Sequence, residues 1–239
     1  MNRELPPPLP PETRTVGQLI AETIRFYGEN FWAVLPLGLA LAAINQTTAG
    51  LAPGAQVLLA AALSPLMAAA FVRASSLVLD APWSWTALVT GSLIYLPVPV
   101  LVRVYLLPGA AWLAFIGLAV PAAVVERVGF RRALERGRRL GTADYVHALG
   151  AVAALAVVYG LTRFLLALLL QGQADVAVRG AIFFADLVLS PILFVGAAIL
   201  YTDQAARARI DSAHAALHPP VDALDAGRPD AQGEPRSAP

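Results

Sequence analysis

The amino-acid sequence predicts an all-α fold, a polytopic transmembrane helical bundle of about six spans with amphipathic interfacial helices before the first and fifth spans. Of the 239 residues, 58% are hydrophobic and 14% are charged, and the mean hydropathy is +0.65. Soluble domains are about 45–50% apolar and about 25% charged, so this chain carries more apolar surface than an aqueous core absorbs. The apolar residues also fall in runs close to the roughly 20 residues that cross about 30 Å of hydrocarbon.

The first 14 residues are predicted to form a disordered tail, because five prolines between Pro6 and Pro11 favour an extended chain. Thr15 and Gln18 then have the spacing of a capping box, which opens a helix. Apolar residues repeat at helical spacing over 16–31, with charged residues elsewhere on the wheel. This pattern predicts an amphipathic helix lying along the membrane interface before the first span.

Residues 15–205 are predicted to form the membrane domain, with six apolar runs at about residues 31–48, 54–79, 85–106, 108–125, 145–170 and 178–201. Prolines inside these runs predict bends, because each removes a backbone donor; they are Pro36, Pro65, Pro97, Pro99, Pro121 and Pro191. The steps Gly38/Ala42 and Gly150/Ala154 favour close helix packing. Residues 206–239, rich in Ala, Asp, Pro and Arg, are predicted to be a largely disordered cytoplasmic tail.

The distribution of arginine predicts the orientation of the spans. All 17 basic residues are arginine, and 14 of them fall on one predicted side of the membrane, whereas the other side receives only Arg179. Cytoplasmic loops are the ones enriched in basic residues. The sequence therefore predicts a multi-pass protein of a bacterial cytoplasmic membrane with both termini cytoplasmic, which requires an even number of spans.

The longest loop on the arginine-rich side, residues 126–145, predicts a basic interfacial helix. Its six arginines are Arg127, Arg131, Arg132, Arg136, Arg138 and Arg139. Near a membrane surface, each basic residue is attracted to anionic lipid head groups by about 1 kcal/mol. The simpler, compatible alternative is that these arginines only enforce topology. A nucleic acid is not a predicted partner, because the patch is short and tethered to the membrane, and no protein partner is identified.

Charges inside the spans are the predicted site, because a charge in hydrocarbon is costly. At about 1.5 Å per residue, Arg163 lies about 10 Å below the outer end of the fifth span and Asp186 about 12 Å below that end of the sixth. These opposite charges are predicted to pair across the helix interface. Arg103, near the outer end of the third span, either joins them or snorkels outward. This intramembrane charged cluster either ties helices together or lines a polar cavity for a ligand, ion or lipid head group.

The residue types exclude several enzyme classes. The chain has no lysine and no cysteine, which excludes a phosphate-binding lysine loop, a Schiff base, a disulfide and a thiolate nucleophile. No paired-carboxylate motif appears, and the intramembrane hydroxyl groups have no nearby histidine base. Asp211, His214 and His218 can share one helical face, but a zinc site needs a fixed geometry that a fraying tail does not offer. We therefore predict no catalytic residues, no metal site and no cofactor.

Two short blocks resemble a bacterial membrane family. The first runs from Val16-Gly17 to Phe31, and the second contains Glu126, Gly129, Ala133-Leu134, Arg136 and Leu140. They resemble the polytopic membrane domain associated with some glycerophosphoryl diester phosphodiesterases, and related stand-alone integral membrane proteins. Glu135 and Gly137 depart from that family's Ala-Leu-Arg-Arg-Ser-like run. The resemblance implies a six-helix bundle over residues 15–205 and no catalysis, since the family's hydrolase chemistry belongs to a separate soluble domain.

The leading functional prediction is a non-enzymatic structural or interaction component of the membrane. The alternative is a transporter or lipid-handling protein with a polar cavity near Arg103, Arg163 and Asp186. A water-accessible cavity holding these side chains would favour the alternative, whereas a dry, closed ion pair would favour the structural role.

Overall fold

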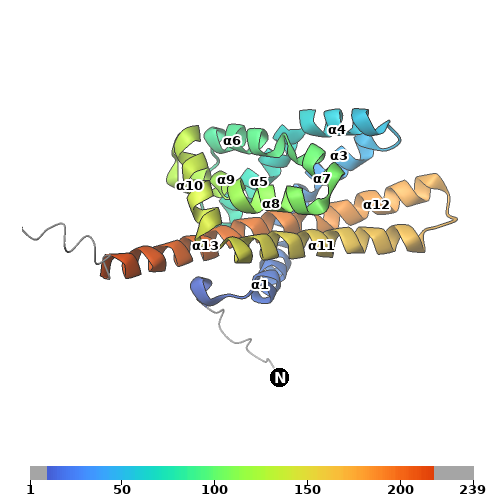
Figure 1. Cartoon of the computed structure of the whole chain (residues 1–239). Helices are drawn as coiled ribbons and strands as arrows, with labels where there is room; N and C mark the ends of the chain where they lie inside the picture. Colours follow the sequence, from blue (N-terminus) through green and yellow to red (C-terminus); the bar gives the residue numbers. More distant parts are fainter. Residues whose placement is uncertain (1–9, 218–239) are drawn as a thin grey trace, which may run out of the picture.

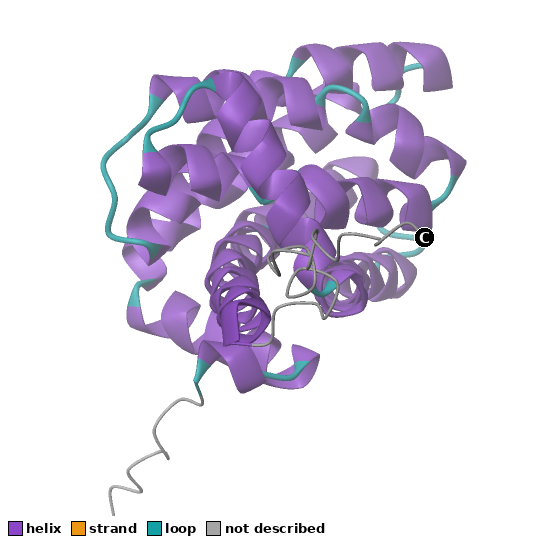
Figure 2. Cartoon of the chain, turned by 60° about the vertical axis from the view of Figure 1, so that its left-hand side comes forward, coloured by secondary structure: helices purple, strands orange, loops and turns teal. Residues whose placement is uncertain are grey.

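The computed structural model describes residues 10–217, which are almost entirely helical and contain no strand. The last two helices, α12 (Asp175–Leu189) and α13 (Pro191–Leu217), follow one another along one line with α11 (Tyr145–Leu169) beside them, and shorter helices form a second layer against these three (Figure 1). Figure 2 shows the same two layers with the long helices seen nearly along their axes. The elements are η1 (Pro11–Thr13), α1 (Val16–Glu29), α2 (Phe31–Val34), η2 (Leu35–Leu37), α3 (Gly38–Thr48), α4 (Pro53–Ala62), α5 (Ser64–Val78), α6 (Trp85–Tyr95), α7 (Val98–Val104), α8 (Leu106–Ile116), α9 (Ala119–Glu126), α10 (Phe130–Ala143), α11 (Tyr145–Leu169), α12 (Asp175–Leu189) and α13 (Pro191–Leu217).

The all-helical class and the long apolar segments are confirmed. Over the described range, five helical segments are long and apolar enough to cross a membrane, and there are six if α4 and α5 form one bent span. The segments are Phe31–Thr48, Trp85–Val104, Leu106–Glu126, Tyr145–Leu169 and Asp175–Ile210, with α4–α5 as the bent pair. These ranges agree closely with the six predicted runs, and the number that crosses a membrane stays a prediction.

Prolines mark the breaks within the apolar segments. The axes of α4 and α5 differ by 47° at Leu63, and Pro65 is the second residue of α5. Pro99 is likewise the second residue of α7, Pro191 opens α13, and Pro36 lies in η2. In the first turn of a helix a proline loses no backbone hydrogen bond, because that N–H group has no partner within the helix. The predicted bend is confirmed at Pro65, and at Pro36, Pro99 and Pro191 the structure shows a break between consecutive helical elements.

The packing is uneven along the bundle. The core is dense at the end nearest α10, where residues 116–124 are all buried and pack against Phe71 and Phe194. At the opposite end, α4 and α7 contain no buried residue. Protein interiors are normally packed throughout at nearly crystalline density. This chain therefore has a tight end, beside α10, and a loose end, beside the α11–α12 loop.

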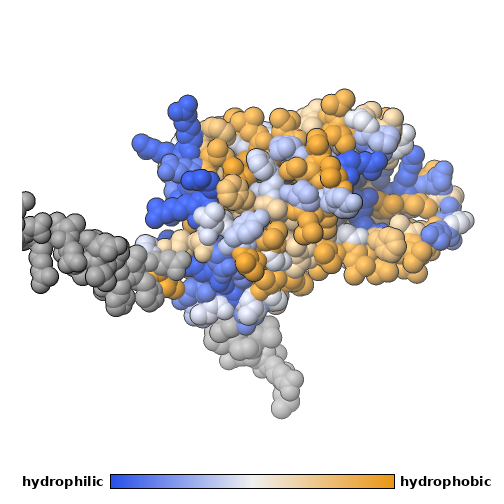
Figure 3. Space-filling model, in the orientation of Figure 1, coloured by the Kyte–Doolittle hydropathy of each residue, from blue (hydrophilic) through white to orange (hydrophobic). Residues whose placement is uncertain are grey.

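The outer surface of α11 is apolar and open. Val157, Leu161 and Phe164 are each more than half exposed. Figure 3 shows hydrophobic residues over most of the middle of the face drawn, with hydrophilic side chains towards both ends, where α10 and the α11–α12 loop lie. Extensive exposed apolar surface on well-formed helices is typical of a surface that faces lipid.

The two helices predicted to be interfacial both form, and they are placed differently. α10 lies across the tight end of the bundle, steeply inclined to α11 and α13 (Figure 1). α1 begins with the predicted capping box of Thr15 and Gln18. Near its end, the Tyr27 hydroxyl donates to the Val188 carbonyl over 2.9 Å, whereas Arg14, just before it, bonds to Asp203.

The orientation of α1 follows from these two contacts. Val188 and Asp203 are about 22 Å apart along the helical segment that contains them, at about 1.5 Å per residue. The two ends of α1 therefore lie at different levels along the continuous segment formed by α12 and α13. The helix is inclined along the bundle. The placement of α1 and α10 relative to a membrane surface stays a prediction.

The folded region extends beyond the predicted domain boundaries at both ends. Residues 10–14, assigned to the disordered tail of 1–14, include η1 and pack against α13. α13 continues to Leu217, past the predicted boundary at residue 205, because its alanine-rich end favours a helix. Residues 1–9 and 218–239, the remainder of the predicted tails, lie outside the described residues.

Candidate functional site

The Asp186 cluster joins α3, α11 and α12 and consists of Asn45, Tyr159, Arg163 and Asp186. Arg163 Nε lies 3.3 Å from Asp186 Oδ1, so the predicted pair is confirmed. The Tyr159 hydroxyl donates to the same oxygen over 2.6 Å, and Asn45 Nδ2 donates to Oδ2 over 2.8 Å. The carboxylate is fully buried, whereas the Arg163 side chain remains 31% exposed. Three donors thus compensate the charge that burial would otherwise penalise.

The close approach of α3 to α12 makes this cluster possible. A methyl group at Gly38 would overlap the backbone of Leu187, so only glycine permits this spacing. Asn45, two turns further along α3, then reaches Asp186. The close packing predicted for the Gly38 step is confirmed. The sequence did not single out Tyr159, although its position one helical turn before Arg163 in an apolar span was the available signal.

Arg103 is not part of the Asp186 cluster. It lies in the last turn of α7 and is exposed, and the described residues provide no ion pair that joins it to Asp186. α7 packs chiefly against α8, away from α12. Of the two predicted positions for Arg103, joining the pair is therefore wrong, and pointing outward is compatible with its exposure.

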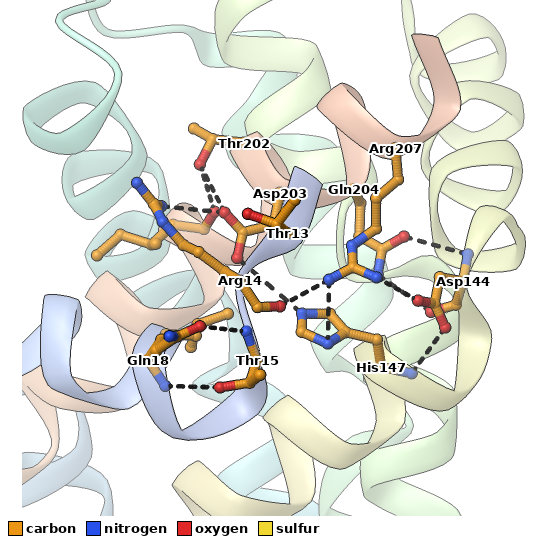
Figure 4. Close-up of polar contacts among 12 residues, drawn as sticks. Thr13, Arg14, Thr15, Gln18, Asp144, His147, Thr202, Asp203, Gln204 and Arg207 are labelled. Atoms are coloured by element: carbon orange, nitrogen blue, oxygen red, sulfur yellow. Dashed lines mark hydrogen bonds and ion pairs between the residues drawn. The ribbon is translucent and has the colours of Figure 1, made fainter. Parts of the chain in front are cut away.

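The Asp203 cluster joins the start of the fold to α11 and α13 (Figure 4). It consists of Arg14, Asp144, His147, Asp203, Gln204 and Arg207. Asp203 is fully buried, and Arg14 Nη1 lies 3.0 Å from its Oδ1. Arg207 pairs with Asp144 and donates to the Arg14 carbonyl over 2.7 Å. The Gln204 side chain donates to the Asp144 carbonyl and accepts from the Asp144 N–H, over 3.0 and 3.3 Å.

Asp144 has a second role, as the cap of α11. Its carboxylate accepts a hydrogen bond from the His147 N–H over 3.0 Å, which satisfies a backbone donor at the start of that helix. Asp203 Oδ2 and His147 Nε2 lie 4.0 Å apart, and neither has a hydrogen-bond partner among the described residues. The sequence analysis missed this cluster, although Asp144 and Asp203 flank the fifth and sixth apolar runs at the same end.

Five of the six arginines of the predicted basic helix are exposed: Arg127, and on α10 Arg131, Arg132, Arg138 and Arg139. Arg136 instead pairs with Glu126, with Nε 2.8 Å from Oε1. Arg127 lies outside α10, at the end of α9, where its φ of 49° is left-handed. The basic helix is therefore shorter than the sequence predicted, because Arg127 ends the preceding helix, and one of its arginines, Arg136, is bridged to Glu126.

Two glycines bring α10 close to the bundle. A methyl group at Gly137 would overlap the backbone of Ala119, and one at Gly141 would crowd the carbonyl oxygens of Ala114 and Phe115, 2.6 Å away. The glycine face therefore lies against α8 and α9, and the exposed arginines occupy the rest of the helix surface. Gly137, which departs from the family's pattern, has a packing role in this chain.

A cavity of about 470 Å³ lies between the apolar segments. Most of its lining is apolar, with Phe71, Leu155 and Phe194 in its wall, and Asn45 and Tyr159 are among its few polar residues. None of the three predicted charges, Arg103, Arg163 and Asp186, lines it. The cavity therefore differs from the polar cavity of the alternative prediction, because the donors around Asp186 surround its carboxylate.

Metal binding has no support in the part of the chain that the structure describes, where no three His, Asp or Glu side chains lie together as ligands. The side chains of Asp211, His214 and His218 lie outside the described ones.

The fold and its polar clusters define an all-helical chain whose long apolar segments have the length and composition of membrane spans. No protein-family model, curated protein or solved structure matches it. The resemblance to the membrane domain of glycerophosphoryl diester phosphodiesterases therefore stays a prediction.

Proposed function

We propose that the chain is a six-span protein of a bacterial cytoplasmic membrane, with both termini in the cytoplasm, that acts as a non-enzymatic structural or interaction component. The observation that carries this proposal is the use of both buried carboxylates inside the bundle. Asp186 bonds to α3 and α11, and Asp203 bonds to the segment before α1. Charges used in this way join helices together and are not presented to a substrate.

The arrangement of arginine supports the cytoplasmic assignment. The exposed arginines of α10 lie at the same end of the bundle as the Asp203 cluster, because Asp144 of that cluster directly follows α10. Basic residues at this position attract anionic head groups and favour the cytoplasmic side. We therefore assign α10 to the inner leaflet surface, in contact with anionic lipid.

Cysteine labelling tests this topology, because the chain contains no cysteine of its own. Single cysteines replace Thr13, before α1, Gln173, in the α11–α12 loop, and Ser212, near the end of α13. A membrane-impermeant maleimide is expected to label Gln173→Cys in intact cells, and Thr13→Cys and Ser212→Cys only after lysis. Labelling of Thr13→Cys and Ser212→Cys from opposite sides would overturn the even number of spans.

Thermal unfolding in nanodiscs tests the contact of α10 with anionic lipid. Phosphatidylglycerol is expected to stabilise the wild type relative to phosphatidylcholine. Replacing the four exposed arginines of α10 by glutamine should remove this difference. Arg25→Gln is the matched control, because Arg25 is bonded to Glu29 within α1. An equal effect of lipid on the quadruple variant and the wild type would contradict the assignment.

A second candidate function, lipid handling, is favoured by the cavity between the spans. Cavities of about 300–1,000 Å³ with apolar walls and a few polar groups are typical of small-molecule sites. The cavity of about 470 Å³ falls within this range and has Asn45 and Tyr159 in its wall.

A further inference from the structure

The cavity lies at the depth of the middle of the bundle. Its lining on α11 runs from Val152 to Gly160, and α11 runs from Tyr145 to Leu169, so the lining is centred on that helix. All the apolar segments contribute to the wall, through α3, α4–α5, α6–α7, α8, α11 and α13. If these segments cross a membrane, the cavity lies within the hydrocarbon.

The cavity is partly open, and its lining residues show where. Val102 on α7, Leu106 on α8 and Gly160 on α11 line it and are also exposed. Around this mouth the surface is apolar, with Val104, Leu107 and Leu161 each more than half exposed. The mouth therefore opens towards the phase that covers this apolar surface, which in a membrane is the acyl chains of lipids.

The side chains that line the cavity determine which kind of molecule it binds. Cavities lined by apolar side chains do not hold ordered water, which needs two to four polar partners, and they take up apolar molecules. The apolar molecules present at this depth are lipid tails. Gly160 lies about 14 Å from the loop end of α11, and a leaflet supplies about 15 Å of hydrocarbon. A lipid tail from that leaflet is therefore long enough to enter.

We propose that the cavity binds one acyl chain of a phospholipid from the leaflet nearest the α11–α12 loop, with the lipid phosphate beside Arg103. This proposal rests on the membrane placement above and gives the second candidate function its ligand. Arg103 is exposed and directly follows Val102 at the mouth. The Arg103 guanidinium can therefore pair with the phosphate of an entering phospholipid. The loose packing of α4 and α7, which contain no buried residue, leaves room for the acyl chain.

Photo-cross-linking identifies a chain inside the cavity. The full-length protein is placed in nanodiscs that contain phosphatidylglycerol with a diazirine near the end of one acyl chain, and cross-linked peptides are mapped. Leu155 and Phe194 line the cavity and are each only 2% exposed, so lipid on the outer surface does not reach them. Cross-links at these two residues are the expected result. Cross-links confined to exposed residues such as Phe164 would overturn the proposal.

Two glycines provide a matched pair of variants. A Cβ at Gly160 or at Gly180 meets no atom within 4 Å, and only Gly160 lines the cavity. Gly160→Phe is expected to lower cross-linking at Leu155 and Phe194 about tenfold by blocking the mouth. Gly180→Phe should leave it unchanged. An equal yield in both variants would show that the tail does not enter by this mouth and would overturn the proposal.

The head group and the membrane placement are tested separately. Arg103→Gln should reduce the same cross-links with phosphatidylglycerol, and no reduction would refute the phosphate contact. If the protein shows the predicted cysteine-labelling pattern but no cross-link at Leu155, the acyl-chain site is refuted and the membrane placement stands. A failed labelling pattern with no cross-link removes the membrane placement on which the proposal depends.

Discussion

Replacing both members of the pair Arg163 and Asp186 by leucine tests the Asp186 cluster. Asp186→Leu removes the acceptor of the Tyr159 hydroxyl and the Asn45 amide. The Tyr159 hydroxyl is left without an acceptor, whereas the Asn45 amide still donates to that hydroxyl over 3.3 Å. A buried donor without a partner costs about 1–3 kcal/mol, so this variant should lose about 1–3 kcal/mol of unfolding free energy. Arg163, which is 31% exposed, keeps its hydrogen bond to the Tyr159 hydroxyl in that variant.

Arg163→Leu has a different consequence. It leaves a fully buried carboxylate with neutral donors only. Removing one partner of a buried pair costs about 3–5 kcal/mol, because the remaining charge has no compensation. In the double variant the carboxylate is gone, so the loss should return to that of Asp186→Leu alone. The expected coupling equals the loss of Arg163→Leu alone, about 3–5 kcal/mol, at or above the upper end of the usual range for groups in contact.

Unfolding in mixed micelles, with increasing denaturing detergent, measures these losses on the purified chain. Arg103→Leu is the control, because Arg103 is exposed and is not bonded to Asp186 in the structure. It should show no coupling to Asp186→Leu. If the losses of Arg163→Leu and Asp186→Leu simply add, the two side chains do not stabilise each other and the pairing is refuted.

Three further outcomes are expected. Tyr159→Phe, which loses the 2.6 Å hydrogen bond to Asp186, should lower the unfolding free energy by about 1–3 kcal/mol in the same assay. Gly137→Leu should lower the melting temperature, because α10 must then move away from Ala119. Gly28→Leu is the control, because a Cβ at Gly28 meets no atom within 4 Å, and it should leave the melting temperature unchanged. Equal melting temperatures for the two variants would contradict the packing role of Gly137. Asp203→Asn weakens the ion pair with Arg14 and should speed tryptic cleavage after that residue, and an unchanged rate would show that the pair does not hold the segment.

The features that the sequence predicted depend on one helix or on two neighbouring helices. Apolar run length located the long helices, and prolines located their breaks. The pairing of Arg163 with Asp186 followed from depth alone, because two antiparallel helices joined by a short loop align residues equally far from it. These predictions use the rise per residue of a helix and need no knowledge of the full arrangement.

The features that were missed depend on helices far apart in the chain. Arg14 and Asp203 are separated by 189 positions, and each resembles a solvated charge beside an apolar run. Their contact exists only because α1 packs along α13. The size of the cavity likewise depends on how loosely α4 and α7 pack against the other helices. A gap between packed helices has no sequence pattern from which it can be predicted. Arg127 is not part of the basic helix α10, because α9 ends at that residue, which has a left-handed conformation.

The Asp203 cluster also has a consequence for the order in which the protein is completed. Ribosomes release α11 before α13, so Asp144 emerges without Gln204 and Arg207, which bond to it in the finished fold. The same late helix supplies Asp203, the partner of Arg14 near the beginning of the fold. The last helix to be synthesised therefore holds the first segment of the fold in place. A chain truncated before α13 exposes polar groups without partners, which cellular quality control recognises.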